Sequence, residues 1–329
     1  MKALQAGLVG PRQFELFEED LTPDSDEVLI EIAACGICSS EIPMYLGDWP
    51  PELHPEALGG GSMPIPYKPP IILGHEPSGT IVQVGAEVTR FTEGIKVTGA
   101  FNNGFATHAL AKEENLIEVP SGVKLEHALG APLFCITNIA RAAAPKFGDN
   151  VAVVGCGQMG LLIIAALKNA GLGSLIAVDR IQERLDLALS IGATHAINVS
   201  PIDRVMSMTD GGCDVVVEMT GGPSGLELSA DLLRVGQGKL IMAGYHHSPG
   251  RYNLRNFAAK SLVAHSAHPH YSPNQFGDYK RAMAALSSGT FPMDMIVTHR
   301  FHLDQVANGF EALLSNQEGF LKGIVVPKS

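Results

Sequence analysis

The stretch VAVVGCGQMGLLIIAALKNAG, residues 151–171, decides the fold class of this chain. It begins with a β-branched run that predicts a buried strand and continues into an apolar segment of helical length. Between the two stand Gly155, Gly157 and Gly160, in the spacing of a dinucleotide-binding turn. Gly155 permits the turn, Gly157 lets a pyrophosphate approach the backbone, and Gly160 lets the helix pack on the strand. Gln158 and Met159 complete the predicted cofactor loop.

An acidic residue closes the next predicted strand, SLIAVD at 174–179. Asp179 follows Gly160 by 19 residues, where a carboxylate accepts hydrogen bonds from the adenosine ribose hydroxyls. The same charge would repel a 2′-phosphate, so Asp179 predicts NAD rather than NADP. The neighbouring Arg180 is a further candidate for cofactor contact, and its other interpretation is a solvated charge at a helix start.

Predicted strands and helices alternate from about residue 123 to about residue 290. This alternation implies parallel strands joined by right-handed crossovers, and therefore a doubly wound nucleotide-binding domain. Such domains bind ligands at the carboxyl ends of their strands. Thr220, Gly221 and Gly244 follow two of these strands, so they are expected to line the cofactor site.

The first 120 residues have a different pattern, in which short β runs are separated by glycine and proline and helical periodicity is almost absent. This pattern predicts an all-β, partly closed barrel. Residues 45–70 are dense in proline and glycine without any period, so they predict a loop.

Composition limits the functions that the chain can have. Hydrophobic residues make up 46% of the 329 residues and charged residues 17%, which is typical of a globular protein with an ample core. The net charge of −11, without a run of Lys or Arg, argues against nucleic acid or an anionic membrane as a partner. Five unevenly spaced cysteines, no signal-type segment and no long apolar run predict a cytoplasmic protein with reduced thiols.

Two short motifs supply residues that could bind a metal. CGICSSE at 35–41 offers the thiolate of Cys38, and GHEPSGTIVQVG at 74–85 offers the imidazole of His75 and the carboxylate of Glu76. These are ligand types that tetrahedral Zn²⁺ prefers, and a catalytic zinc needs three of them plus an open position. Cys135 is the natural candidate for the third ligand, with Glu76 as the alternative.

These motifs, together with APLFC at 131–135, resemble those of the zinc-dependent medium-chain dehydrogenases, the alcohol and polyol dehydrogenase superfamily. The match runs in order along the whole chain. The resemblance implies a GroES-like catalytic domain at 1–135 and 291–329, with a Rossmann NAD-binding domain at 136–290 between them. It also implies one catalytic zinc, NAD, an alcohol or ketone substrate, and a homodimer or homotetramer.

The resemblance assigns further roles, with three departures from the family pattern. Ser40 matches the position whose hydroxyl relays the alcohol proton, beside the ligands Cys38 and His75, and Glu41 stands where an acid orients a zinc ligand. The four-cysteine lobe for a structural zinc is missing. Pro43 replaces a relay histidine, and Ala131 replaces the glutamate of polyol-type members.

Two alternatives stay open from the sequence. One is a zinc-free enone or quinone reductase of the same superfamily, whose members lack the cysteine and GHE ligands. The other is a non-catalytic nucleotide-binding protein in which Cys35 and Cys38 form a redox or structural CxxC. For the substrate, the loop at 45–70 and His265, His268 and His270 favour a polyhydroxylated alcohol, such as a polyol or cyclitol.

Overall fold

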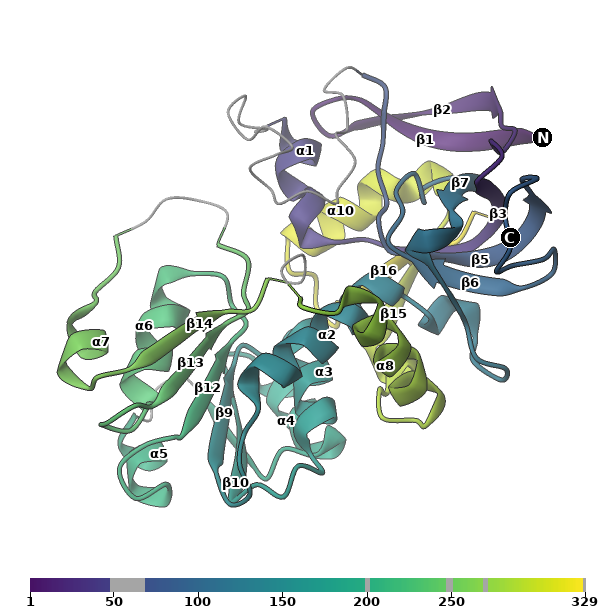
Figure 1. Ribbon diagram of the computed structural model, residues 1–329. Coiled ribbons are helices and arrows are strands. Elements are labelled where there is room, and N and C mark those ends of the chain that lie inside the picture. Colours follow the sequence, from purple (N-terminus) through teal and green to yellow (C-terminus); the bar gives the residue numbers. More distant parts are fainter. Residues whose placement is uncertain (48–68, 199–201, 247–250, 269–271, 328–329) are drawn as a thin grey trace. The chain divides into compact units, whose positions relative to one another are not determined.

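A computed structural model describes residues 1–47, 69–198, 202–246, 251–268 and 272–327 (Figure 1). The chain divides into two units, and each is described here by itself. Unit 1 comprises residues 1–134, 274–289 and 293–329, and unit 2 comprises residues 135–273 and 290–292.

Unit 2 is built on a parallel sheet of six strands. Its order follows the nucleotide-binding pattern, with two halves that diverge from the central strands β9 and β12. The valine, isoleucine and leucine side chains of β9, β10 and β12 are buried because helices cover both faces of the sheet (Figure 1). In sheet order the strands are β11 (His195–Asn198), β10 (Ser174–Asp179), β9 (Asn150–Val154), β12 (Val215–Glu218), β13 (Lys239–Met242) and β14 (Val263–Ser266).

The helices of unit 2 connect these strands. The predicted helices at 161–171, 183–192 and 226–236 correspond to α3, α4 and α6, whereas α5 and α7 are short helices that the sequence pattern did not single out. The bounds are α3 (Gln158–Leu167), α4 (Gln182–Ile191), α5 (Ile202–Met208), α6 (Pro223–Leu232) and α7 (Arg255–Ala259). The predicted doubly wound sheet is therefore confirmed.

Unit 1 is the predicted β domain. A seven-stranded sheet runs β15 (Val297–Phe301), β16 (Lys322–Val325), β3 (Glu27–Gly36), β5 (Pro77–Val84), β6 (Lys96–Gly99) and β8 (Leu116–Glu118), with β7 (His108–Lys112) also paired to β3. A smaller sheet has the order β2 (Gln13–Asp20), β1 (Lys2–Gly10) and β4 (Ile71–Ile72). Only the pairing of β15 with β16 is parallel among these described strands.

The C-terminal segment returns to unit 1, as the resemblance implies. β16 pairs antiparallel with the end of β3, where Ile324 faces Gly36 and Val325 faces Cys35. The helix α10 (Val306–Leu314) packs on the same core through Phe310, whose ring stacks on Tyr45 with centroids 4.6 Å apart. Tyr45 belongs to the short helix α1 (Ile42–Leu46), within the stretch predicted as a loop at 45–70, most of which lies outside the described residues.

The division into units differs from the predicted domain bounds at one helix. The helix α8 (Gln275–Ser287) groups with unit 1, although the predicted nucleotide domain extended to residue 290. Its Tyr279 ring stacks on Phe134 with centroids 4.4 Å apart, and the Arg90 guanidinium lies 5.0 Å from the centre of the Phe276 ring. The helix α2 (Gly130–Ala143) contains the point at which unit 1 ends and unit 2 begins.

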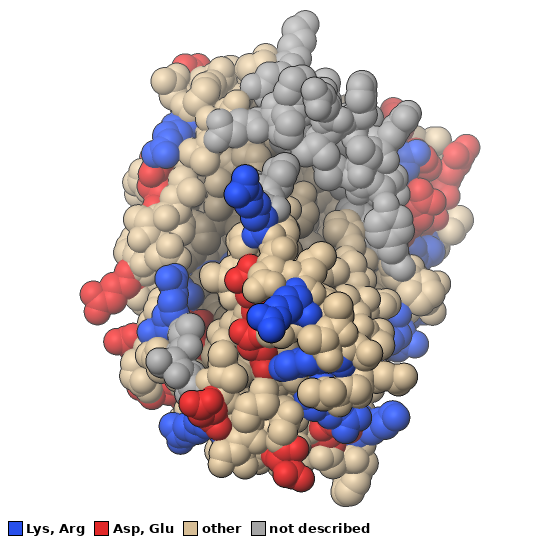
Figure 2. Space-filling model, turned by 90° about the vertical axis from the view of Figure 1, so that its left-hand side faces the viewer, with Lys and Arg blue, Asp and Glu red and all other residues tan. Residues whose placement is uncertain are grey.

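The surface carries charges of both signs. On the face drawn in Figure 2, the Lys and Arg side chains lie among Asp and Glu side chains. Among the described residues, no helix is both long enough and apolar enough to span a membrane.

Candidate metal centre and dinucleotide site

Three of the four predicted metal ligands lie together in unit 1. Cys38 follows β3 and precedes a 3-10 turn at Ser39–Glu41, while His75 and Glu76 lie between β4 and β5. One ligand atom from each of Cys38, His75 and Glu76 lies within 4.8 Å of the others. The antiparallel pairing of β3 with β5 brings these two distant motifs to the same end of the sheet.

Gly74 makes the turn that delivers His75. Its φ of +96° lies in the left-handed region, where a side chain is strained. A Cβ at this position would also lie 2.7 Å from the backbone nitrogen of Phe105 and 2.9 Å from Cys35 Sγ. The glycine of the GHE motif is therefore required by backbone geometry and by space.

Glu41 fixes the orientation of the His75 ring. This carboxylate is buried, and its Oε1 accepts a hydrogen bond from the Gly74 backbone at 2.7 Å and lies 3.0 Å from His75 Nδ1. The other ring nitrogen, Nε2, lies 3.5 Å from Ser40 Oγ, which donates to Cys38 Sγ at 3.3 Å. The orienting contact expected for Glu41 is thus present, and Ser40 touches two of the candidate ligands.

Lys322 is a residue of the site that the sequence reasoning missed. The residue is 1% exposed, and its ammonium lies 2.5 Å from Glu76 Oε2 as an ion pair and donates to the Ile37 carbonyl at 2.8 Å. Burial alone would raise the pKa of Glu76, but the charges of Lys322 and His75 outweigh it, so the pKa is lowered and the carboxylate stays ionised. One signal in the sequence could have indicated this role. Lys322 is the first residue of the apolar run KGIVV, so a charged side chain stands at a position that is expected to belong to the core.

The thiols of this region differ in their environment. Burial raises the pKa of Cys35 well above its usual value, and its Sγ donates to the Gly36 carbonyl. A buried thiol of this kind is inert, which argues against Cys35 and Cys38 acting as a redox pair. No disulfide joins any of the five cysteines, all of which are described.

Cys135 is not a member of the three-residue group. It lies on α2 as the first residue of unit 2, half-buried. Its role as a zinc ligand stays a prediction.

The donor set fits zinc. A thiolate, an imidazole held by a carboxylate, and a second carboxylate are the ligand types that catalytic zinc sites use. Within the described part of the chain, Glu76 Oε2 is paired with the Lys322 ammonium and has no assigned hydrogen-bond donor. Burial would lower the pKa of His75, but Glu41 and Cys38 outweigh it and raise the pKa well above its usual value. A metal ion would compete with that proton.

The dinucleotide turn of unit 2 has the predicted geometry. Gly155 has a φ of +95°, and Gly157 is the N-cap of α3. Asp179 ends β10 and accepts from the Cys156 backbone at 2.6 Å and the Ile181 backbone at 2.9 Å. At the start of α3, the buried Nε2 of Gln158 has no hydrogen-bond partner among the residues that the structure describes. A buried donor without a partner beside a helix N-terminus fits a site that receives a polar ligand.

The remaining cofactor candidates lie at the expected edge of the sheet. Arg180 follows β10 and is exposed, Thr220 follows β12, and Gly244 follows β13. Met159 lies in the first turn of α3. The part of these residues in cofactor binding stays a prediction.

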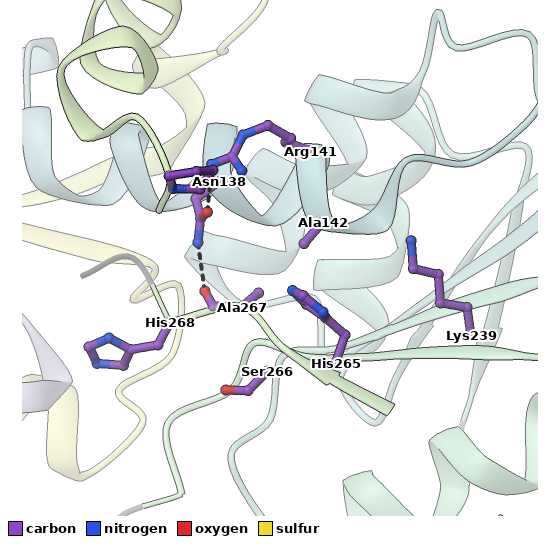
Figure 3. A pocket seen from close by; sticks show the side chains of 9 residues that line it. Asn138, Arg141, Ala142, Lys239, His265, Ser266, Ala267 and His268 are labelled. Carbon is purple, nitrogen blue, oxygen red and sulfur yellow. Dashed lines mark hydrogen bonds between the residues drawn. The ribbon is translucent and has the colours of Figure 1, made fainter. Parts of the chain in front are cut away.

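Two of the three histidines considered for the substrate line a cavity of about 420 Å³ in unit 2 (Figure 3). His265 and His268 share this cavity with Lys239 and with Asn138, which donates to the Ala267 carbonyl at 2.9 Å and accepts from Arg141 at 2.8 Å. His270 lies outside the described residues.

The fold and the metal centre define a zinc-binding dehydrogenase of two units. The family described as alcohol dehydrogenase GroES-like domain matches residues 24–130, and the family described as zinc-binding dehydrogenase matches residues 159–288. The chain therefore belongs to the zinc-binding medium-chain dehydrogenase superfamily, and it is an enzyme of that family. Zinc and a nicotinamide dinucleotide are the cofactors typical of this family.

The chain is similar along nearly its whole length to proteins of known name. It is 29% identical to L-threonine 3-dehydrogenase of Bacillus licheniformis, with 92% of each chain covered. It is 28% identical to (R,R)-butanediol dehydrogenase of Bacillus subtilis, covering 93% of this chain and 94% of that one. The crystal structure of 2R,3R-butanediol dehydrogenase from Bacillus subtilis superposes with a TM-score of 0.83 at 25% identity, covering 99% of this chain and 100% of that chain.

The buried ion pair gives a stability prediction. Replacing Lys322 with methionine keeps the length of the side chain but leaves the Glu76 carboxylate buried without its counter-ion. We expect the free energy of unfolding, measured by urea denaturation of zinc-free protein, to fall by about 3–5 kcal/mol. The control is Arg12→Met, which removes the exposed Arg12–Glu311 pair and should cost less than about 1 kcal/mol. Equal losses in the two variants would contradict the role assigned to Lys322.

Proposed function

We propose that the protein is a zinc- and NAD-dependent dehydrogenase that oxidises a secondary alcohol bearing further polar groups, such as a polyol or cyclitol. The observation that carries the proposal is the group of Cys38, His75 and Glu76, with Glu41 orienting the His75 ring. These ligand types favour the dehydrogenase over the zinc-free reductase, whose members lack them.

Each side chain of the site has a role in this proposal. Zinc, when bound, supplies a Lewis acid that lowers the pKa of an alcohol. Cys38 and His75 hold the metal together with Cys135 or Glu76. The Ser40 hydroxyl, which contacts Cys38 Sγ and His75 Nε2, relays the alcohol proton by passing its own proton on as it accepts one. Pro43 has no proton to pass on, so the onward path differs from that of members with a histidine there.

The relatives support the substrate class. Those named for L-threonine, butanediol and sorbitol act on compounds in which a secondary hydroxyl has a polar group on a neighbouring carbon. The cavity with His265, His268 and Lys239 adds polar groups to unit 2, which carries the cofactor turn. A polar alcohol is therefore favoured over a long apolar one.

Metal content and activity together test this proposal. Purified protein should contain one zinc per subunit and reduce NAD with members of a panel of polyols, cyclitols and simple alcohols. Cys38→Ser should lose both zinc and activity, yet bind NADH with an unchanged dissociation constant, because the cofactor turn belongs to unit 2. Elemental analysis and NADH titration measure these quantities. Two zincs per subunit, or a Cys38→Ser variant that keeps its metal and activity, would refute the assignment.

Ser40→Ala separates proton transfer from metal binding. The alanine variant should keep its zinc, because the hydroxyl is not a ligand, while turnover falls on the order of 10²-fold for the loss of one acid–base group. Steady-state kinetics and zinc analysis of the same preparation provide the measurement. Turnover equal to that of the wild type would remove Ser40 from the mechanism.

Cofactor preference depends on Asp179. The wild-type enzyme should turn over faster with NAD than with NADP at equal concentration, because the carboxylate repels a 2′-phosphate. Asp179→Gly should weaken NAD binding and relax the preference. Initial rates with both cofactors decide the point, and a wild-type enzyme that prefers NADP would contradict it.

A further inference from the structure

We infer that Glu218 is a positioning residue for the cofactor, because it joins two loop segments at the carboxyl edge of the unit 2 sheet. The inference rests on the proposed function, in which NAD binds at this edge. Glu218 is the last residue of β12 and is fully buried. A carboxylate in such a position is costly unless its oxygens are well hydrogen-bonded.

One carboxylate oxygen organises the turn after β12. Glu218 Oε1 accepts hydrogen bonds from the Thr220 backbone at 2.6 Å, the Thr220 hydroxyl at 2.5 Å and the Gly221 backbone at 2.9 Å. Thr220 and Gly221 are the residues predicted to line the cofactor site. Three donors on one charged oxygen fix both the backbone of this turn and the rotamer of Thr220.

The other oxygen reaches the loop after β13. Glu218 Oε2 lies 3.1 Å from His246 Nε2, and His246 Nδ1 lies 3.4 Å from the Tyr252 hydroxyl. This arrangement suits an imidazole that donates from Nε2 to the carboxylate and accepts from the tyrosine. The Glu218 carbonyl also accepts from the backbone of Ala243 at 3.0 Å and of Gly244 at 2.8 Å.

Glycines around the network show how closely it is packed. A Cβ at Gly155, in the phosphate turn, would lie 2.9 Å from Thr220 Cγ2, and a Cβ at Gly244 would lie 2.8 Å from Glu218 Oε2. The threonine held by Glu218 therefore forms a wall of the turn that receives the pyrophosphate. A change in the rotamer of Thr220 would move this wall against the cofactor.

Glu218→Gln tests the inference because it keeps the side-chain volume but removes the charge. The glutamine side chain has one amide nitrogen. Depending on its orientation, this nitrogen lies opposite His246 Nε2 or opposite the three donors from Thr220 and Gly221. We expect the dissociation constant for NADH and the KM for NAD to rise about tenfold, which corresponds to the loss of one charge-assisted hydrogen bond. Zinc content and kcat at saturating NAD should stay within about twofold of the wild type.

Asp214→Asn is the matched control, because Asp214 immediately precedes β12, at the end of the strand opposite Glu218. It accepts from the Asn150 backbone at 2.8 Å and pairs with Arg234 at 2.7 Å, away from the cofactor edge. This variant should lower the melting temperature without changing the NADH dissociation constant. A purely structural role for Glu218 would give the same result for Glu218→Gln.

Two variants of His246 keep the inference testable if Glu218→Gln does not fold. His246→Gln retains a donor toward Glu218 and should bind NADH nearly as the wild type does, whereas His246→Leu should bind more weakly. The inference is overturned if His246→Leu, or a folded Glu218→Gln, binds NADH as tightly as the wild type. Wild-type protein that binds no NADH would instead overturn the proposed function.

Discussion

The pairing of β16 with β3 is the contact on which the metal centre depends. β3 leads into Cys38, and β16 begins with Lys322, so two antiparallel backbone partners bring a buried ammonium to the Glu76 carboxylate. The Ile37 backbone, which donates to the Gly323 carbonyl at 3.0 Å, extends the same pairing toward the cysteine. Without these contacts the buried Glu76 carboxylate would lose its ion pair with the Lys322 ammonium.

In each unit, a buried glutamate at the candidate site contacts both a backbone turn and a histidine ring. In unit 1, buried Glu41 accepts from a backbone N–H and holds His75, and in unit 2, buried Glu218 accepts from backbone N–H groups and holds His246. In each case a carboxylate combines charge-assisted hydrogen bonds to a turn with one to an imidazole. A glutamate so placed fixes a turn and a ring together, and a hydrophobic residue of equal volume could not do this.

Local patterns in the sequence were sufficient for most of the fold. The β-branched runs that became β9, β10 and β12, and the glycine turn at Gly155, depend on neighbouring residues and were predictable for that reason. The grouping of Cys38, His75 and Glu76 as candidate ligands was predictable from their motifs. The ion pair of Lys322 was not, because its partner is distant in sequence and only the sheet register brings the two together. The grouping of α8 with unit 1 depends likewise on a distant contact, that of Tyr279 with Phe134.

Unit 1 is built from segments of the chain that lie before and after unit 2, and this arrangement has a consequence for biosynthesis. A ribosome completes nearly all of unit 2 before it makes β15 and β16, so the nucleotide-binding sheet can form first. The synthesis of the β domain begins first, but its buried cation, Lys322, is added only with β16. Until then the nascent chain carries Cys38, His75 and Glu76 of the candidate metal centre without the Lys322 ion pair. The order of synthesis thus lets the ion pair of the candidate metal centre form only after unit 2 has been made.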